Sequence, residues 1–158
     1  IAQEGKASLK GGANSPKKTK RKSKGKPIAG WQPGGTCKLS VKSGVLRVDS
    51  NGKDPHLSFQ LPAAVDADTF TFHVRMKSDS SGRGQVFWKQ AGRPFAAERS
   101  QQFDVQHDGK YHEYTVKLAA DTPVRGVRID PSNAVGRIKI ADIRLTGNSG
   151  EIIHQWSF

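Results

Sequence analysis

The sequence predicts an all-β protein, an antiparallel β-sandwich preceded by a disordered basic tail. Apolar residues recur at every second position in about nine short runs, and turn-forming segments separate these runs at spacings near ten residues. No window shows a convincing helical period. This pattern is typical of two packed antiparallel sheets. A jelly-roll topology is compatible with it, although periodicity alone does not select one topology.

The clearest strand is TFTFHVRMK at residues 69–77. Its residues Phe70, Phe72, Val74 and Met76 share one face, and polar or charged residues occupy the other, as in a half-buried strand. Similar runs are VLRVDS (45–50), HLSFQL (56–61) and KYHEYTVKL (110–118), and further strands are expected at KLSV (38–41), GQVFWKQ (84–90), QQFDVQ (101–106) and VRGVRID (124–130).

The segment GRIKIADIRLTG at residues 136–147 changes its alternation in the middle. Two of its apolar residues, Ile138 and Ile140, share one parity, whereas Ile143 and Leu145 share the other. A one-residue bulge at Ala141-Asp142 would return all four side chains to one face. The sequence therefore predicts a β-bulge at this point.

Turn-forming residues fill the segments between these runs. Gly tolerates positive φ, Pro fixes φ, and Asp, Asn and Ser side chains bond to nearby backbone groups. The segments are KSG (42–44), SNGKDP (50–55), KSDSSGRG (77–84), QHDGK (106–110), ADTP (120–123) and DPSNAVG (130–136).

Most of the excess positive charge lies before the predicted domain. The 158 residues have a formal net charge of +12, but residues 1–27 hold nine Lys and Arg against one acid, a net charge of +8. The other 131 residues hold 17 basic and 13 acidic groups, a net charge of +4. The first 27 residues lack aromatic residues and cannot bury enough apolar surface to fold. We expect an extended Lys-rich linker at 1–27 and one domain at 28–158.

Several classes of site lack the residues that they need. The single cysteine, Cys37, excludes an internal disulfide and a Cys-based zinc site. The five His residues show no paired-ligand spacing, which argues against a zinc or nucleophile-base role. No apolar run approaches the roughly 20 residues needed to span a bilayer, and no signal peptide is visible. Because the chain begins at Ile1, we expect a fragment or a processed product.

Four successive segments resemble a known family. They are GRGQVFWKQ (82–90), QQFDVQ (101–106), HDGKYHEYTVKL (107–118) and VRGVRIDPSNAVGRIKIADIRL (124–145). This succession is similar to accessory β-sandwich modules of the galactose-binding-like, carbohydrate-binding-module type. More narrowly, it resembles the C-terminal module that follows a Lys-rich linker in secreted bacterial sulfatases, notably planctomycete arylsulfatases. The resemblance covers about residues 28–158, and its most specific element runs from Gly126 to Pro131, followed by Gly136 and the Ile-rich last segment.

The resemblance implies a non-catalytic module of a secreted or periplasmic protein. Such a module binds glycan or packs on its catalytic neighbour. The sulfatase signature, a Cys-x-Pro-x-Arg type segment, has no counterpart, because Cys37 lies in TCKLS. We therefore expect no enzymatic activity from this chain, although its parent could be a sulfatase or another polysaccharide-acting enzyme. The expected partners are an acidic or sulfated polysaccharide and the upstream catalytic domain, with no specific nucleic acid and no membrane.

Aromatic and basic residues are the candidates for glycan binding. An aromatic ring can stack on the apolar face of a sugar, and Arg pairs with carboxylate or sulfate oxygens. The alternative is that the three Trp residues close the core and that the basic residues belong to an ordinary solvated surface. The candidate set is Trp31, Arg83, Trp88, Lys89, Arg93, Phe95 and Arg99.

Three acidic residues, Asp49, Asp54 and Asp130, are weak candidates for a structural calcium site. Calcium takes about six to eight oxygen ligands, and no loop supplies a recognisable set at fixed spacing. Both Asp54 and Asp130 precede Pro, where Asp commonly initiates a turn. We expect no other cofactor.

Two other functions stay open at this point. The sandwich could pack on the upstream domain without touching a ligand, and a large exposed apolar patch would favour this role. The basic tail could bind nucleic acid through phosphate contacts. However, it lacks interleaved aromatic residues, and the folded part shows no motif that reads DNA or RNA.

Overall fold

The structure is a computed structural model that describes residues 25–120 and 123–158. The predicted linker falls mainly on residues 1–24, which lie outside the described residues. Every pairing between the described strands is antiparallel, which confirms the predicted fold class, and no helix among the described residues is long and apolar enough to cross a bilayer. The elements are β1 (Gln32–Lys42), β2 (Val45–Val65), β3 (Thr69–Ser78), β4 (Gly84–Lys89), a 3-10 turn η1 (Ala97–Arg99), β5 (Ser100–Phe103), β6 (His112–Ala119), β7 (Val124–Asp130), β8 (Gly136–Thr146) and β9 (Ile152–Trp156).

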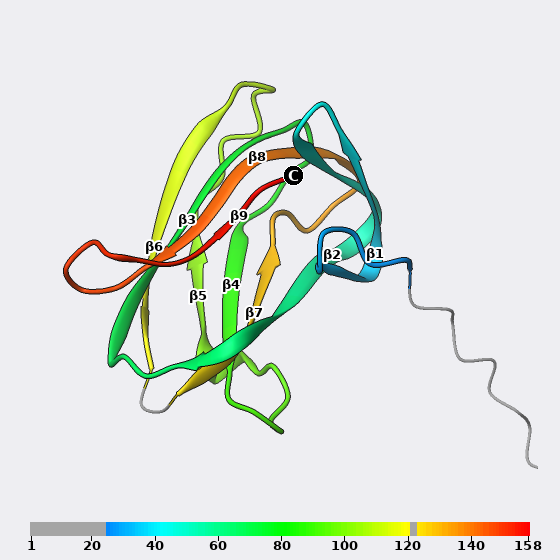
Figure 1. Cartoon of the computed structure of the whole chain (residues 1–158). Helices are drawn as coiled ribbons and strands as arrows, with labels where there is room; N and C mark the ends of the chain where they lie inside the picture. Colours follow the sequence, from blue (N-terminus) through cyan, green and yellow to red (C-terminus); the bar gives the residue numbers. More distant parts are fainter. Residues whose placement is uncertain (1–24, 121–122) are drawn as a thin grey trace, which may run out of the picture.

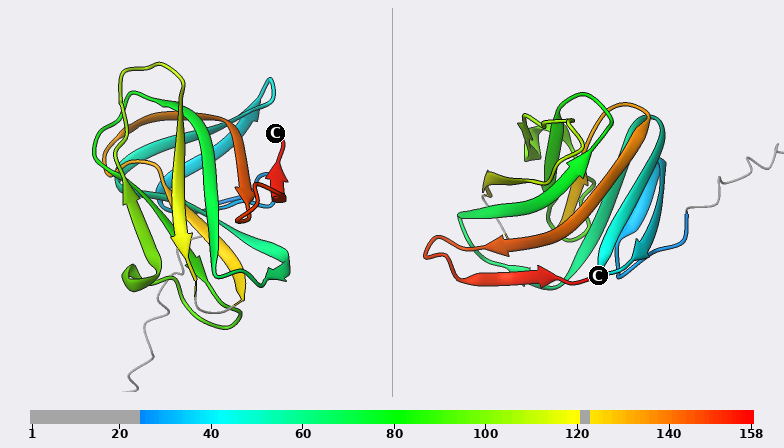
Figure 2. Two further views of the ribbon diagram at one scale, coloured as in Figure 1. Left: turned by 90° about the vertical axis from the view of Figure 1, so that its left-hand side faces the viewer. Right: turned by 90° about the horizontal axis from the view of Figure 1, so that it is seen from above.

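The strands form two layers that enclose the core (Figure 1). The layer that we call the β3–β8 layer has the order β6-β3-β8-β2-β1, with β9 beside the second half of β8. Figure 2 shows β8, in orange, running between β3 and β2. The other layer, the β4–β7 layer, has the order β5-β4-β7-β2-β1.

The long strand β2 belongs to both layers. Residues 46–50 of β2 pair with β8, whereas residues 57–60 pair with β7. Strand β1 accompanies β2 through both layers, with a register shift between Gly35 and Cys37 that leaves residues 51–54 unpaired. The turn predicted at SNGKDP is therefore corrected. The chain does not reverse there but bends from one layer into the other, and turn-forming residues permit that bend.

Alternate side chains of the strands fill the space between the layers. On β3, the four apolar residues that the alternation assigned to one face are each at most 1% exposed. Burying a side chain of this size contributes roughly 1.5–3 kcal/mol. The same alternation turns polar residues outward on every strand, so the pairing register decides which of them become neighbours. The largest fully buried side chains are Trp31, Leu46, Leu57, Leu61, Phe70, Phe72, Met76, Leu118, Ile129, Ile138, Ile140 and Ile143.

The bulge predicted in the last long strand is present. Arg75 of β3 pairs with Asp142 of β8, but the next residue, Met76, pairs with Ile140, so Ala141 is the extra residue. As a result Ile138, Ile140, Ile143 and Leu145 are all fully buried. The bulge keeps both halves of β8 directed into one core.

Two short segments differ from expectation. β9 was not assigned to a strand, because Ile152 and Ile153 are adjacent and break the alternation. Only Trp156 of this strand is buried, whereas Ile152 is 59% exposed. β5 is shorter than QQFDVQ and ends at Phe103. Both segments lie at the edges of their layers, where one-sided pairing weakens the pattern.

We predict that insertion of one alanine after Ala141 strongly destabilises the protein. With a second extra residue, one half of β8 must either turn its isoleucines outward and bury charged side chains or give up part of its pairing with β3. Deletion of Ala141 instead leaves the four apolar residues of β8 in strict alternation without a bulge, so this variant should remain folded.

Urea denaturation should show a large loss of the free energy of unfolding, or no folded state, for the insertion after Ala141 alone. Insertion of one alanine after Ala67, in the loop between β2 and β3, is the matched control and should be far milder. Equal effects of the two insertions would contradict the role given to the bulge.

Candidate functional site

The three Trp residues lie in the core. Trp31 is fully buried and its ring packs 5.4 Å from Phe59 and 5.3 Å from Trp156, measured between ring centroids. Trp88 is 8% exposed and packs against Phe70. Its parity follows Val86, which is fully buried. We therefore correct the sequence-based assignment of Trp31 and Trp88 to a ligand surface, because neither ring offers a face to solvent.

Strands β4 and β7 present a polar outer face. Because Val86 and Trp88 point inward, Gln85, Phe87 and Lys89 of β4 point outward. On β7 the inward residues are Val127 and Ile129, so Arg128 and Asp130 point outward. The register pairs Gln85 with Asp130, Phe87 with Arg128, and Lys89 with Gly126.

The centre of this face is an ion pair held on an aromatic ring. Arg128 donates from Nε and Nη2 to the two carboxylate oxygens of Asp130, both at 2.7 Å. Its guanidinium carbon lies 4.6 Å from the centroid of the Phe87 ring. Asp54 approaches the same guanidinium at 3.7 Å. This geometry fixes the arginine, since a bidentate pair and a stacked ring both restrict its rotamers.

Burial raises the pKa of Asp130 above its ordinary value, and the Arg128 guanidinium opposes that shift without cancelling it. The carboxylate is therefore less well solvated than an ordinary surface aspartate. Folding has already removed part of the water around this carboxylate. A ligand that donates a hydrogen bond to Asp130 would take the place of that water.

Part of the predicted basic and aromatic set gathers beside this ion pair. The Nζ atom of Lys89 lies 5.2 Å from the centroid of the Phe95 ring, and Phe95 packs edge-on against Phe87. Gly126 makes this contact possible, because a Cβ at that position would lie 2.9 Å from Cε of Lys89. Phe95 is half-buried, so an edge or face of its ring remains accessible.

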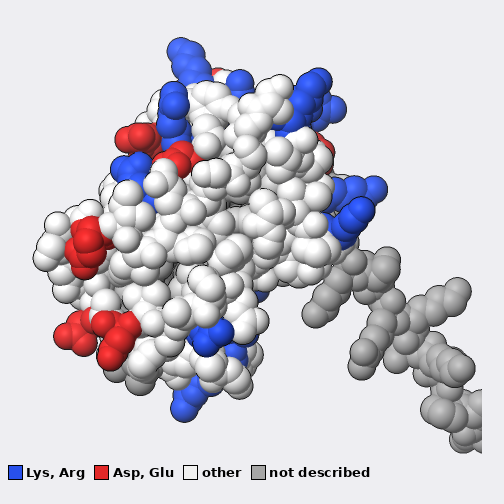
Figure 3. Space-filling view, in the orientation of Figure 1, with Lys and Arg blue, Asp and Glu red and all other residues white. Residues whose placement is uncertain are grey.

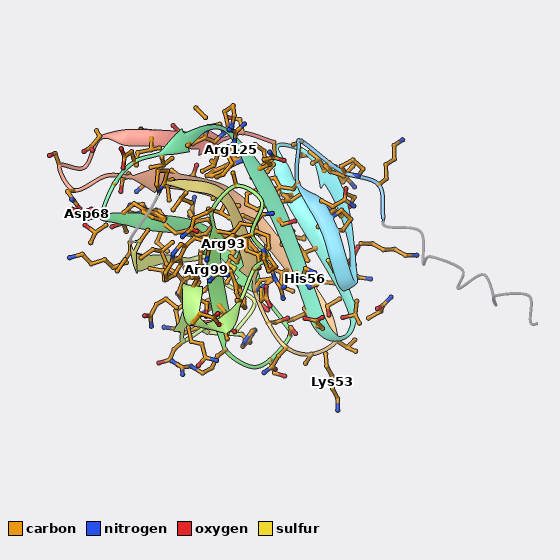
Figure 4. All side chains as sticks on the ribbon, turned by 90° about the horizontal axis from the view of Figure 1, so that it is seen from below. Lys53, His56, Asp68, Arg93, Arg99 and Arg125 are labelled. Carbon is orange, nitrogen blue, oxygen red and sulfur yellow. The ribbon has the colours of Figure 1, made fainter. Side chains whose placement is uncertain are left out.

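The other three predicted residues, which are all arginines, lie beyond the two ends of β4. Arg99 donates to the carbonyl of Pro94 and lies on the same β4–β5 connection as Arg93, which is exposed. Figure 4 labels the two arginines close together near the middle of the view from below. Arg83 lies at the opposite end of β4, where it pairs with Asp104 and Gln102. The structure therefore brings together Lys89 and Phe95, with Arg93 and Arg99 on the adjoining connection, and separates Arg83 from them.

A groove extends the same face toward β1. It has a volume of about 710 Å³ and its lining includes Gln32, Gly34, Cys37, His56 and Ser58. Ser58 lies beside the ion pair, because it is the β2 partner of Arg128 in the register. The face from β4 to β1 crosses four strands at about 4.8 Å each, so it could accommodate an extended ligand.

Cys37 is a structural residue of this groove. Its Sγ donates to the carbonyl of His56 at 3.2 Å and lies 3.4 Å from the carbonyl of Gly34. Burial raises the pKa of the thiol. A raised pKa lowers the thiolate fraction, so the arrangement does not favour nucleophilic chemistry.

The three aspartates considered for calcium each face a cation. Asp54 and Asp130 both contact Arg128, and Asp49 lies 3.8 Å from Arg137. Within residues 25–120 and 123–158, no group of three or more His, Cys, Asp and Glu side chains is arranged to hold a metal ion. The described geometry thus assigns these carboxylates to ion pairs.

Sequence reasoning missed Arg128 as a site residue and gave Asp130 a different role. The signal was present in GVRID, because residues two apart on a strand share a face. Asp130 was interpreted as a turn former because Pro131 follows it. The contact with Phe87 could not be found without the pairing of β4 with β7.

No family model matches the sequence, and no curated protein matches it significantly. Solved structures do share its fold. A variant of a carbohydrate-binding module of family 29 has a TM-score of 0.55 at 17% identity, over 73% of this chain and 79% of that one. A Bacteroides thetaiotaomicron protein described as sugar-binding has a TM-score of 0.56 at 13% identity, over 72% and 82%. A family 4 module has a TM-score of 0.52 at 15% identity, over 69% and 76%. The chain therefore has the β-sandwich fold of these modules.

We predict that Trp88 contributes to stability and not to ligand contact. Trp88→Ala should lower the free energy of unfolding by about 3–5 kcal/mol, as for other large-to-small core substitutions. Denaturation in urea measures this loss. Trp88→Phe, which retains an aromatic ring in the core, should stay folded and bind any glycan ligand as the unmodified chain does. Loss of binding with unchanged stability would contradict the assignment to the core.

Proposed function

We propose that this chain is a non-catalytic carbohydrate-binding module whose ligand lies across the outer face of the β4–β7 layer. The observation that carries the proposal is the fixed Arg128–Asp130 pair on the Phe87 ring, beside a groove of about 710 Å³. Sugar hydroxyls both donate and accept hydrogen bonds. A charged donor and a charged acceptor held side by side can therefore bind neighbouring hydroxyls at once.

The structural neighbours support this proposal. One family 29 structure is a complex with mannohexaose, and its TM-score to this chain is 0.51. In that family the mechanism of ligand recognition was probed with variants that replace an arginine and an aspartate two positions apart. Arg128 and Asp130 of this chain have the same spacing, and both lie on the outer face of β7. The likeness in spacing favours these two residues as the centre of the site.

Each neighbouring residue has a chemical role in this proposal. Phe95 offers a ring for the apolar face of a pyranose, and Lys89 holds its charge beside that ring. Gln85 and Ser58 flank the ion pair in the register and can bond to further hydroxyls. Polar side chains that surround a small apolar surface are typical of sites that orient a ligand.

The ligand that we propose is an acidic or sulfated polysaccharide. Lys89, Arg93 and Arg99 supply positive charge at the end of the face that holds Phe95. The sequence resemblance supports a parent that is a sulfatase or another polysaccharide-acting enzyme, secreted or periplasmic, with the basic segment as linker. In such a protein the module would keep the catalytic domain near its polymeric substrate.

A purely structural role has less support. Among the described residues the exposed large hydrophobic side chains are Val41, Val135 and Ile152. They lie on β1, on the loop before β8 and on β9, respectively. A docking surface for another domain would need a contiguous apolar patch. Nucleic-acid binding would rest on residues 1–24, outside the described part of the chain.

The proposal predicts that Arg128→Ala weakens glycan binding about tenfold to a hundredfold, the range expected for hydrogen bonds that involve a charged group. The test is calorimetry of the full chain against mannan, glucan, xylan and sulfated oligosaccharides, after circular dichroism has verified the fold.

Arg144→Ala is the matched control. Arg144 pairs with Asp142, also two positions away, but on the outer face of the β3–β8 layer. We expect this variant to retain the affinity of the unmodified chain. An equal loss in both variants, or no binding of any oligosaccharide by the folded chain, would contradict the proposed site.

A further inference from the structure

The outer face of the β3–β8 layer carries a row of three cations. The register places Arg47 of β2 opposite Lys139 of β8, and Lys139 opposite Lys77 of β3. All three side chains point away from the core, because their neighbours along the strands are buried. Adjacent strands are about 4.8 Å apart, so three like charges stand side by side within about 10 Å.

The rows on either side are compensated by acids. In one of them Arg137 lies near Asp49, and its backbone N–H donates to Asp79. In the other Arg75 is paired in the register with Asp142 on one side and Glu113 on the other. For Arg47, Lys77 and Lys139, by contrast, no ion pair is found within residues 25–120 and 123–158.

This uncompensated row has a free-energy cost. Like charges directly opposite one another on paired strands are destabilising. Arg47 has a further unmet requirement, since its Nε is buried without a hydrogen-bond partner among the described residues. Both costs would fall if an anion lay against the row.

The row lines a cavity that could admit such an anion. The cavity has a volume of about 400 Å³, and its lining includes Arg47, Lys77, Arg137 and Lys139 as well as Asp49 and Asp79. The four basic and two acidic side chains leave a net charge of +2 in the lining. Figure 3 shows Lys and Arg atoms along the upper margin of the molecule, with acidic atoms beside them at the upper left, while the middle of the view lacks charged atoms.

An aromatic ring closes one end of the row. Nζ of Lys77 lies 4.8 Å from the centroid of the Tyr111 ring, and the guanidinium carbon of Arg75 lies 5.1 Å from it. Tyr111 is half-buried and therefore keeps part of its surface accessible. The ring restrains Lys77 and adds a surface for the apolar part of a ligand.

We propose that this cavity is a second binding site, for the sulfate or carboxylate groups of an acidic glycan. Lys77 and Lys139 would act as charges, and Arg47 as a donor to the oxyanion. The site lies on the layer opposite to Arg128 and shares with the proposed function only the class of ligand. Two such sites would allow one module to bridge two chains, or two parts of one chain, of an acidic polysaccharide.

The test compares two double variants of the full chain that remove the same charge. Lys77→Gln with Lys139→Gln alters the row, whereas Lys53→Gln with Lys117→Gln removes exposed lysines that line none of the cavities described above. A sulfated hexasaccharide, a uronate hexasaccharide without sulfate and a neutral hexasaccharide are titrated at about 0.15 M salt, where screening weakens remote charges.

We expect the row variant to bind at least one of the two anionic hexasaccharides about tenfold more weakly, as befits loss of charge-assisted contacts, while the control variant changes less than about twofold. A loss of affinity for the sulfated hexasaccharide identifies sulfate as the bound group, and a loss for the uronate hexasaccharide identifies carboxylate. Affinity for the neutral hexasaccharide should be unchanged, which separates this site from the face around Arg128. Without ligand, the row variant should also melt at a higher temperature than the control variant, because repulsion is relieved.

Equal losses in the two variants would overturn the proposal, since binding would then follow total charge. A loss of affinity for duplex DNA in the row variant as large as that for the anionic hexasaccharide would also overturn it, in favour of a phosphate-binding surface. Neither result would affect the prediction for Arg128→Ala.

Discussion

Backbone pairing along a single strand, β2, holds the two layers of this sandwich together. Its first part is bonded to β8 and its later part to β7, and β1 follows it through both layers. Both outer faces therefore have a register that is fixed relative to this strand. A slip of one residue in either half would expose Leu46 or Leu57, both fully buried, and bury their charged or polar neighbours.

This constraint explains why the two outer faces differ so much in chemistry. On the β4–β7 layer Arg128 pairs with Asp130 of the same strand, and the register sets it against the Phe87 ring, which gives a rigid and polar centre. On the β3–β8 layer the register aligns cations across three strands. The same alternation of buried and exposed residues generates both surfaces, and they differ in the outward residues that the register brings side by side. In both proposed sites an aromatic ring restrains a lysine at the edge of the charged cluster. Phe95 contacts Lys89 on one layer, and Tyr111 contacts Lys77 on the other.

Much of the fold was predictable from local pattern. The parity change in β8 was sufficient to predict the bulge at Ala141, and the alternation in β3 and β6 assigned their faces. The site was less predictable, because it depends on which strands pair. Trp88 was a reasonable candidate until its parity with Val86 could be tied to the core. The row of Arg47, Lys139 and Lys77 joins residues up to 92 positions apart in the sequence. No local pattern reveals such a contact, since it is created by long-range pairing.

We propose above that the outer face of the β4–β7 layer binds glycan through the Arg128–Asp130 pair. The most direct measurement is a titration of the isotopically labelled full chain with its best-binding oligosaccharide, followed by amide chemical shifts. If this face binds the ligand, the largest shifts fall on β4, β7 and the later part of β2, including Gly126, Arg128 and Ser58. Shifts confined to residues 1–24, or an absence of shifts on β7 at saturating ligand, would contradict it.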